Sequence, residues 1–144
     1  MNPLEIRTMV KEDWKTYKKL RLLSLQDSPD SFGSTYEREV GFPDEEWMFR
    51  LDSENSETYA LPLVAEFNGI AAGLAWGLCH NPEDNVAHVY QMWVSPDARG
   101  QGIGKMLLNR IVTWAKEAGL KEVSLAVTTT NAAAHIQSKQ PLMH

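Results

Sequence analysis

Three glycines at alternate positions are the clearest sign of chemistry in this sequence. Gly100, Gly102 and Gly104 stand between Arg99 and Lys105, after the apolar run VAHVYQMWV and before a segment with helical spacing. This arrangement predicts a loop between a strand and a helix. Such a loop directs several backbone N–H groups at one point, where the helix N-terminus adds partial positive charge. Because glycines let a ligand touch the backbone, the loop suits a phosphate or pyrophosphate group.

The spacing of the glycines excludes two common phosphate-binding loops. A P-loop needs glycine five residues before Gly104 and serine or threonine after the lysine, but the chain has Arg99 and Met106 there. A dinucleotide fingerprint, G-x-G-x-x-G, needs its last glycine at position 105 or 107, where Lys105 and Leu107 stand. The glycines alone therefore leave two interpretations open, an anion site and an ordinary turn at a helix start.

The complete stretch is more specific than its glycines. Arg99-Gly100-Gln101-Gly102-Ile103-Gly104 resembles the Arg/Gln-x-x-Gly-x-Gly/Ala signature of the GNAT superfamily of N-acetyltransferases. The context also fits, with a strand ending in Val-x-Pro before it and an amphipathic helix, a strand and an asparagine after it. Upstream, RLLSLQDSPDSFGSTYERE and EEWMFRL resemble the first two helices of bacterial members. The resemblance implies an α/β fold, a mixed and mostly antiparallel sheet flanked by helices.

The same resemblance implies acetyl-CoA as cosubstrate and direct attack by an amine, without an acyl-enzyme. The residues implied to hold the pyrophosphate are Arg99, Gly100, Gln101, Gly102, Ile103, Gly104 and Lys105. The pantetheine arm would lie in a splay beside the central strand, held by Met92, Trp93, Val94 and Asn131. A backbone N–H near Val94 would face the thioester oxygen as an oxyanion donor.

A base is needed because an alkylamine is protonated at neutral pH, with a pKa of about 10.4 for lysine. His88 stands eleven residues before Arg99, where histone-modifying members of the family carry a glutamate base. An imidazole titrates near neutral pH, so His88 is the candidate base, with Tyr90 and Glu66 as alternatives. The other interpretation is that His88 only lines the sheet. Alternation along the strand is expected to place four residues on one face: His88, Tyr90, Met92 and Val94.

The C-terminal residues depart from the family pattern. Members usually place a tyrosine acid seven residues after the asparagine and then a Gly-Phe pair, whereas this chain has Ser138 and KQPLMH. NAAAHIQSKQ is expected to begin a helix that Asn131 caps and Pro141 ends. The two strands that typical members add next have no counterpart before His144. The chain is thus expected to be truncated or altered, to be completed by a partner chain, such as a second copy in a homodimer, or to transfer poorly.

The rest of the chain indicates a single domain, residues 1–144. Alternating or apolar runs predict strands in LEIRTMV, TYALPLVAEFNG, IAAGLAWGLCH, VAHVYQMWV and KEVSLAVTTT. Asn68-Gly69, between the second and third of these, is a common hairpin dipeptide. Helical spacing predicts helices in EDWKTYKKLRLLSLQDSP, in PDEEWMFRLDSE and from the glycines to Gly119. With the C-terminal helix, the expected order is β-α-α-β-β-β-α-β-α.

Composition narrows the classes of partner. The net charge is −5 without a basic stripe, which argues against nucleic acid. Cys79 is the single cysteine, so neither an internal disulfide nor a multi-cysteine metal site is expected, and Cys79 is expected to be buried rather than nucleophilic. The N-terminus lacks the pattern of a signal peptide, and no apolar run approaches membrane-spanning length. A cytoplasmic protein is expected.

The expected function is transfer of an acetyl group from acetyl-CoA to a primary amine of a small molecule or peptide. A second interpretation is a catalytically impaired acyl-CoA-binding protein that acts as a sensor or regulatory subunit. A third is a protein-interaction module that binds no CoA. Residues 44–49 fall where the family builds its acceptor lid, and the acids there could steer a cationic amine. The other interpretation is that Trp47 packs the helix and the acids cap it.

Overall fold

A computed structural model describes residues 4–28, 34–52, 59–79, 83, 85–128 and 135–141. Its helices and strands follow one another as β1 (Leu4–Thr8), η1 (Lys11–Asp13), α1 (Trp14–Asp27), α2 (Tyr36–Glu39), α3 (Asp44–Arg50), β2 (Tyr59–Phe67), β3 (Ile70–Cys79), β4 (Val86–Val94), η4 (Pro96–Ala98), α4 (Ile103–Glu117), β5 (Glu122–Thr128) and β6 (His135–Pro141). Among the helices of these residues, none is long and apolar enough to cross a membrane.

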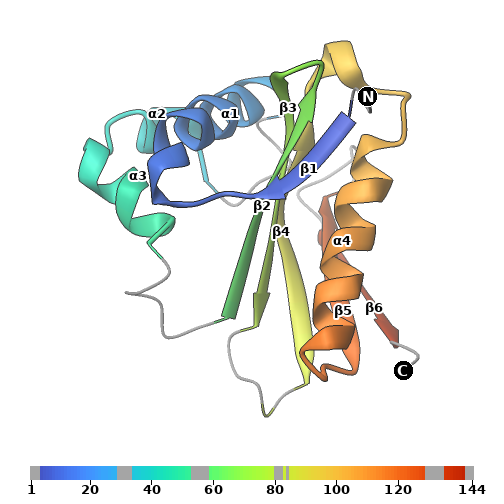
Figure 1. Cartoon of the computed structure of the whole chain (residues 1–144). Helices are drawn as coiled ribbons and strands as arrows, with labels where there is room; N and C mark the ends of the chain where they lie inside the picture. Colours follow the sequence, from blue (N-terminus) through green and yellow to red (C-terminus); the bar gives the residue numbers. More distant parts are fainter. Residues whose placement is uncertain are drawn as a thin grey trace.

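One sheet of six strands organises the fold, in the order β1-β2-β3-β4-β5-β6. Neighbouring strands are antiparallel except β4 and β5, which are parallel. Helix α4 covers one face of the sheet, and α1 and α3 lie on the opposite face (Figure 1). The expected mixed, mostly antiparallel α/β fold is confirmed. The predicted hairpin is also confirmed, since Asn68 and Gly69 have φ of 52° and 82° between β2 and β3.

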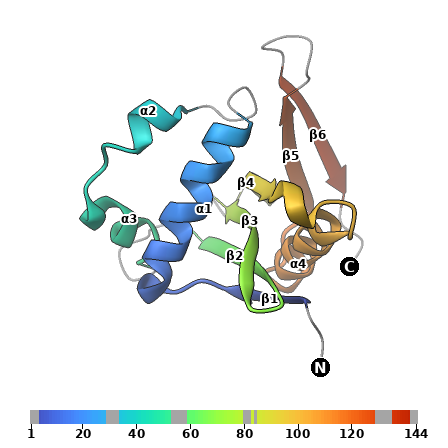
Figure 2. The same ribbon diagram turned by 90° about the horizontal axis from the view of Figure 1, so that it is seen from above.

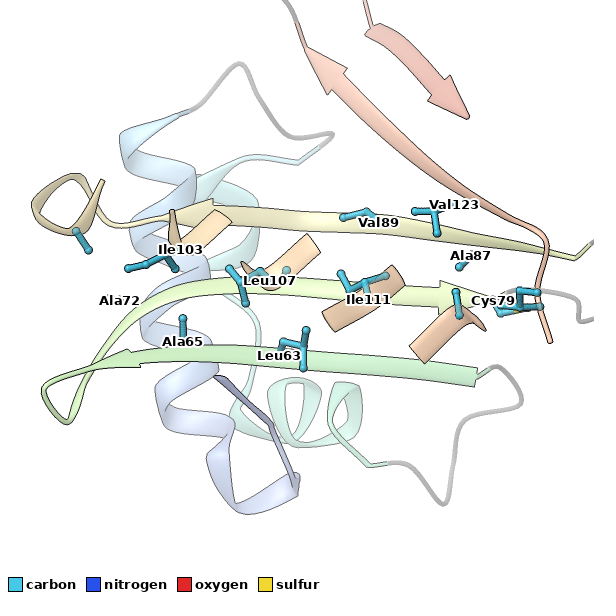
Figure 3. Packing of buried hydrophobic residues seen from close by; sticks show 14 residues of the cluster. Leu63, Ala65, Ala72, Cys79, Ala87, Val89, Ile103, Leu107, Ile111 and Val123 are labelled. Carbon is cyan, nitrogen blue, oxygen red and sulfur yellow. The ribbon is translucent and has the colours of Figure 1, made fainter. Parts of the chain in front are cut away.

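Two apolar clusters hold the helices against the sheet. On the α4 face, Ile103, Leu107 and Ile111 lie at helical spacing and pack on strand residues such as Leu63 and Val89, as Figure 3 shows. On the other face, side chains of α1 and α3 pack on β2, β3 and β4 in a cluster that includes Tyr17, Leu20, Trp47, Val64, Leu74, Trp76 and Trp93. Helices therefore pack on both faces of the central strands, and this packing holds β4 in place where it separates from β5.

A β-bulge divides β4 into two parts with opposite facing. Leu74 pairs with Trp93 and Trp76 pairs with Tyr90, so β4 has one residue more than β3 between these pairs. Gln91 has φ of 55° at this point. Before the bulge, Val89 packs on the α4 face, whereas Tyr90 shares the opposite face with Trp76. After the bulge the two faces exchange: Met92 and Val94 pack on the α4 face, and Trp93 packs on the opposite face.

This bulge corrects one expectation from the sequence. His88 and Tyr90 lie on the face of α1 and α3, because their partners Leu78 and Trp76 do, whereas Met92 and Val94 pack against the α4 cluster. The four residues therefore do not share one face, because strict alternation fails across an inserted residue.

The C-terminal part also differs from the expectation. Residues 135–141 form β6, antiparallel to β5 with Thr128 opposite His135 and Glu122 opposite Pro141. The helix predicted from Asn131 to Pro141 is thus wrong over the described residues, and Asn131 itself lies outside them. One strand follows β5 where the sequence suggested that none would. The pairing with β5 outweighs the weak helical pattern of this short stretch.

Candidate active site

The glycine loop lies between η4 and the N-terminus of α4. Gly100 and Gly102 have φ of 83° and 78°, a region that favours glycine, and Gly102 is the N-cap of the 15-residue helix α4. A Cβ placed on either glycine would meet no atom within 4 Å, so open space lies above both. The backbone amides that begin α4 and the exposed Lys105 border this space. The loop therefore fits a pyrophosphate, because a large anion can approach bare backbone at a helix N-terminus.

A splay opens beside β4, next to the loop. The parallel pairing of β4 with β5 runs from Val86–Glu122 to Val89–Leu125, and neither strand ends there. Beyond Val89 the two strands diverge, which Figure 3 shows as β5 leaving the line of β4, and Figure 2 shows β5 and β6 extending past the rest of the sheet. The last residues of β4 thus face no β5 partner on that side.

Two backbone positions of β4 point into the splay. The Ser95 N–H donates to the Ala72 carbonyl at 2.8 Å, so it points towards β3, and the Val94 N–H must point the other way. Met92, two residues earlier, has the same orientation. The Val94 carbonyl accepts a hydrogen bond from Arg99 Nε at 3.0 Å. The backbone N–H groups of Met92 and Val94 thus point into the splay, and Arg99 links Val94 to the glycine loop.

Arg99 and Trp93 have structural partners on α1. The Arg99 guanidinium pairs with the Asp27 carboxylate, and the Trp93 indole N–H donates to the same oxygen at 2.9 Å. These hydrogen bonds, with one from Ser28, hold the pKa of Asp27 below its usual range. The Trp93 side chain is buried on the α1 face, so only its backbone lies near the splay. Asp27, the last residue of α1, therefore connects this helix to Arg99 at the start of the glycine loop.

The candidate base lies on the α1 face of the sheet. The rings of His88 and Tyr90 stack with centroids 6.0 Å apart, and Tyr90 is exposed. Of the alternatives, Glu66 forms an ion pair with Arg7, which also pairs with Asp13 at 2.9 Å. Glu66 is thus committed to a contact between β1 and β2, far along the sheet from β4. Of the three candidates, His88 and Tyr90 lie on β4 on either side of Val89, where the pairing with β5 ends.

Two further residues from the sequence stand apart from the loop. Cys79 is buried at the end of β3, as expected. Ser138 lies in β6 opposite Leu125 rather than on a helix. Within the described ranges, no group of three or more metal-ligating side chains gathers.

A cavity of about 750 Å³ opens on the α1 and α3 face. Its walls come from the start of the chain, α1, α3 and strands β2 to β4, and they include Tyr17, Arg50, Trp76 and Gln91. The segment expected to form a lid contributes Glu46 and Phe49, and Phe49 is 58% exposed. Trp47 instead is fully buried against Tyr17, with ring centroids 5.5 Å apart. Gln91 thus lies both in the bulge of β4 and in the wall of the cavity.

The sequence did not indicate three polar residues of this cavity, Tyr17, Arg50 and Gln91. The Tyr17 hydroxyl donates to Gln91 Oε1 at 2.9 Å and accepts from Arg50 Nη1 at 3.3 Å. Burial raises the pKa of Tyr17, so the phenol stays protonated and donates at neutral pH. The three residues are separated by 33 and 74 positions along the chain, and only the fold brings them together. No local motif could have revealed them.

A buried ion cluster holds Arg50 in place. Glu39 is 2% exposed and pairs with Arg21 at 2.8 Å and with Arg50 at 3.2 Å. Burial alone would raise the pKa of Glu39, but hydrogen bonds from Arg21 and Ser34 and the charges of both arginines outweigh it and lower the pKa. Glu39 is therefore ionised and fixes the Arg50 guanidinium at the cavity wall.

Comparison with known proteins agrees with this geometry. The sequence profile of the acetyltransferase (GNAT) family matches residues 17–136. An uncharacterized N-acetyltransferase of Methanocaldococcus jannaschii is 33% identical over 89 residues, which are 59% of this chain but only 37% of that protein. The chain thus matches well under two thirds of that relative's length.

Solved structures show the same fold. A GNAT-family acetyltransferase from Streptococcus pneumoniae superposes with a TM-score of 0.69 at 21% identity, covering 89% of this chain and 77% of that one. The PaiA N-acetyltransferase of Thermoplasma acidophilum, in complex with coenzyme A, gives 0.69 at 20% identity, covering 90% and 82%. The profile match extends over most of the chain, and the fold agrees with it. The chain belongs to the acetyltransferase (GNAT) family.

Proposed function

We propose that this protein transfers an acetyl group from acetyl-CoA to a primary amine of a small molecule or peptide. The observation that carries the proposal is the open glycine loop at the N-terminus of α4, directly beside the splayed edge of β4. These two features together supply an anion site and a strand edge. Membership of the family supports the same reaction.

The donor site uses mainly backbone groups. The amides from Gly100 to Lys105 bind the pyrophosphate, and Gln101 and Ile103 contribute through their backbone in the same loop. The open edge at Met92 and Val94 binds the pantetheine arm as a strand would. Arg99 shapes the loop by its bonds to Val94 and Asp27. Trp93 contributes through its backbone, and Asn131 is proposed from the sequence motif alone.

The catalytic groups lie on either side of the bulge. Bound acetyl-CoA supplies an activated acetyl thioester. The Val94 N–H, which points into the splay, stabilises negative charge on the carbonyl oxygen. His88 takes a proton from the ammonium group, directly or through water, so that the neutral nitrogen can attack the thioester carbon. As the C–N bond forms, the C–S bond breaks, and the leaving thiolate takes up the second proton that the nitrogen loses. Because the bulge places His88 on the α1 face, the amine approaches from the side of the 750 Å³ cavity.

The test is a calorimetric titration with acetyl-CoA, followed by thiol release with a panel of amines. Binding with thiol release supports the proposal, and the amines that respond give the acceptor class. Binding without release would show that the chain holds the donor but does not transfer, as in an acyl-CoA-binding protein. Absence of binding would remove the assignment of the glycine loop.

A further inference from the structure

The lining of the 750 Å³ cavity carries hydrogen-bond donors that have no acceptor among the described residues. Arg50 donates through Nε to Glu46 and through Nη1 to Tyr17 and Glu39, which leaves Nη2 without an acceptor among the described residues. Gln91 accepts from Tyr17 through Oε1, so its Nε2 amide remains to donate. Both residues line the cavity.

Trp76 lies in the same wall, but its indole N–H is buried without a partner in the part of the chain that the structure describes. Because this N–H has almost no accessible surface, a ligand in the cavity does not reach it. The donors that a ligand can meet are therefore Arg50 Nη2 and Gln91 Nε2. Two idle donors in one cavity indicate that the ligand brings the acceptor atoms.

The positions of the donors are fixed by other contacts. The Arg50 guanidinium lies 5.0 Å from the Trp47 ring centre and 5.1 Å from that of Phe42, and Glu39 binds it from behind. Tyr17 holds Gln91 from the other side. Preorganised donors of this kind suit a carbonyl or carboxylate oxygen, because little entropy is lost when they bind.

The mouth and walls of the cavity favour the other parts of such a ligand. Among the lining residues, Glu46 pairs with Arg50 at 3.3 Å and Asp52 pairs with Lys11 at 3.6 Å. Glu12 adds a third carboxylate that no cation of the lining offsets, and this single net negative charge favours an ammonium group. Phe49, exposed on α3, offers apolar surface for a side chain.

We propose that the acceptor is an α-amino acyl group with an apolar side chain, whose carboxylate or carbonyl oxygen is bound by Arg50 and Gln91. The inference rests on the proposed acetyl transfer, because it names the amine that the site takes. Gln91 stands next to Met92 on β4, so an oxygen bound there keeps the neighbouring α-amine beside the splay. A free amino acid and a peptide N-terminus share this chemistry.

The experiment compares matched amines in the thiol-release assay. One series is leucine, leucinamide, leucylglycine and isoamylamine, which has the same side chain and no carbonyl. We expect kcat/KM for the best carbonyl compound to exceed that for isoamylamine by about 10- to 100-fold. Preference for leucine assigns a free amino acid, and preference for leucinamide and leucylglycine assigns a peptide N-terminus.

Variants separate recognition from the basicity of the amine, which a carbonyl also changes. Arg50→Lys keeps the charge beside Glu39 but removes Nη2, and we expect the ratio between carbonyl compound and isoamylamine to fall about 10-fold. Gln91→Leu should lower the same ratio. Arg38→Lys is the matched control, since Arg38 is exposed on α2 outside the cavity, and its ratio should equal that of the wild type.

Acetyl-CoA affinity, measured for each variant, shows whether the donor half remains folded. Equal ratios in wild type, Arg50→Lys and Gln91→Leu would overturn the inference while leaving acetyl transfer intact. If no amine releases thiol, acetyl transfer itself fails. Calorimetry with leucinamide then decides the inference: weaker binding to Gln91→Leu than to Arg38→Lys supports it, and equal binding overturns it.

Discussion

The two halves of the proposed site differ in the groups that form them: one uses backbone groups and the other uses side chains. The proposed donor half consists of backbone, with two glycines at positive φ, the first turn of α4 and the edge of β4. The proposed acceptor half consists of side chains from α1, α3, β3 and β4. A backbone site needs a few residue types at fixed local spacing, whereas a side-chain site depends on where the fold brings distant residues. One stretch of sequence therefore sufficed to propose the first half, whereas no single stretch could indicate the second.

The largest effect should come from filling the space above the donor loop. Gly102→Glu puts a side chain at φ of 78° and a carboxylate where the pyrophosphate binds. Left-handed backbone costs about 1–2 kcal/mol of stability in the free and the bound protein alike. The repulsion between like charges acts only on the complex and costs several kcal/mol, so acetyl-CoA affinity should fall by about 1,000-fold. Calorimetric titration measures this loss.

Gly69→Glu is the control for backbone strain. Gly69 has φ of 82° in the β2–β3 turn, and a Cβ there meets no atom within 4 Å, as at Gly102. It should lose comparable stability but keep its acetyl-CoA affinity. If both variants bind acetyl-CoA equally well, the donor half does not lie at this loop.

The same contrast explains what the sequence could predict. The glycine loop, the hairpin at Asn68-Gly69 and helix α4 depend on local spacing, and all are found. The reversal of faces along β4 could not be predicted, because Gln91 carries no residue-type signal for a bulge. The link between Tyr17, Arg50 and Gln91 is invisible in the sequence, since it depends on packing of α1 and α3.

The C-terminus shows how a tertiary contact overrides a local pattern. Asn131 and the alanines after it suggested a helix start, yet residues 135–141 pair with the whole length of β5. A free strand edge supplies hydrogen bonds that a marginal helix cannot match, because short helices are unstable without packing. A prediction from local helix propensity is therefore wrong for residues 135–141.

A second prediction concerns the residue between the halves. His88→Gln should lower kcat/KM by about 100-fold, because general bases contribute that much or more. The loss should shrink as the pH approaches the pKa of the acceptor ammonium, about 10.4 for an alkylamine, because the neutral amine then needs no base. Thiol release at several pH values tests both points, and a variant with the wild-type profile would remove His88 as the base.

A smaller effect should follow from cutting the contact inside the acceptor half. Tyr17→Phe keeps the ring packed on Trp47 and Trp76 but removes the hydroxyl between Arg50 and Gln91. The loss is about 1 kcal/mol, which predicts a roughly fivefold higher acceptor KM with unchanged acetyl-CoA affinity. Because burial raises the pKa of Tyr17, the effect should be constant from pH 6 to 8. A loss of acetyl-CoA affinity instead would show that the halves are not independent.

The smallest effect should appear at the joint between the halves. Asp27→Asn removes the charge that Arg99 pairs with, while its amide can still accept from Trp93. Partly exposed pairs contribute about 0.5 kcal/mol, so acetyl-CoA affinity should fall about twofold at pH 7. The folded pKa of Asp27 is lowered, so its contribution to stability is present above the unfolded value of about 3.9 and is lost as the pH falls through the folded one.

Urea unfolding at pH 7 and in strong acid tests this joint, with Asp97→Asn as the control. Asp97 is exposed in η4 on the same loop and has no side-chain partner within the described ranges. Asp27→Asn should be less stable than wild type at pH 7 and equal to it in acid, whereas Asp97→Asn should match wild type at both. Equal stability of Asp27→Asn and wild type at pH 7 would mean that the ion pair does not stabilise the loop.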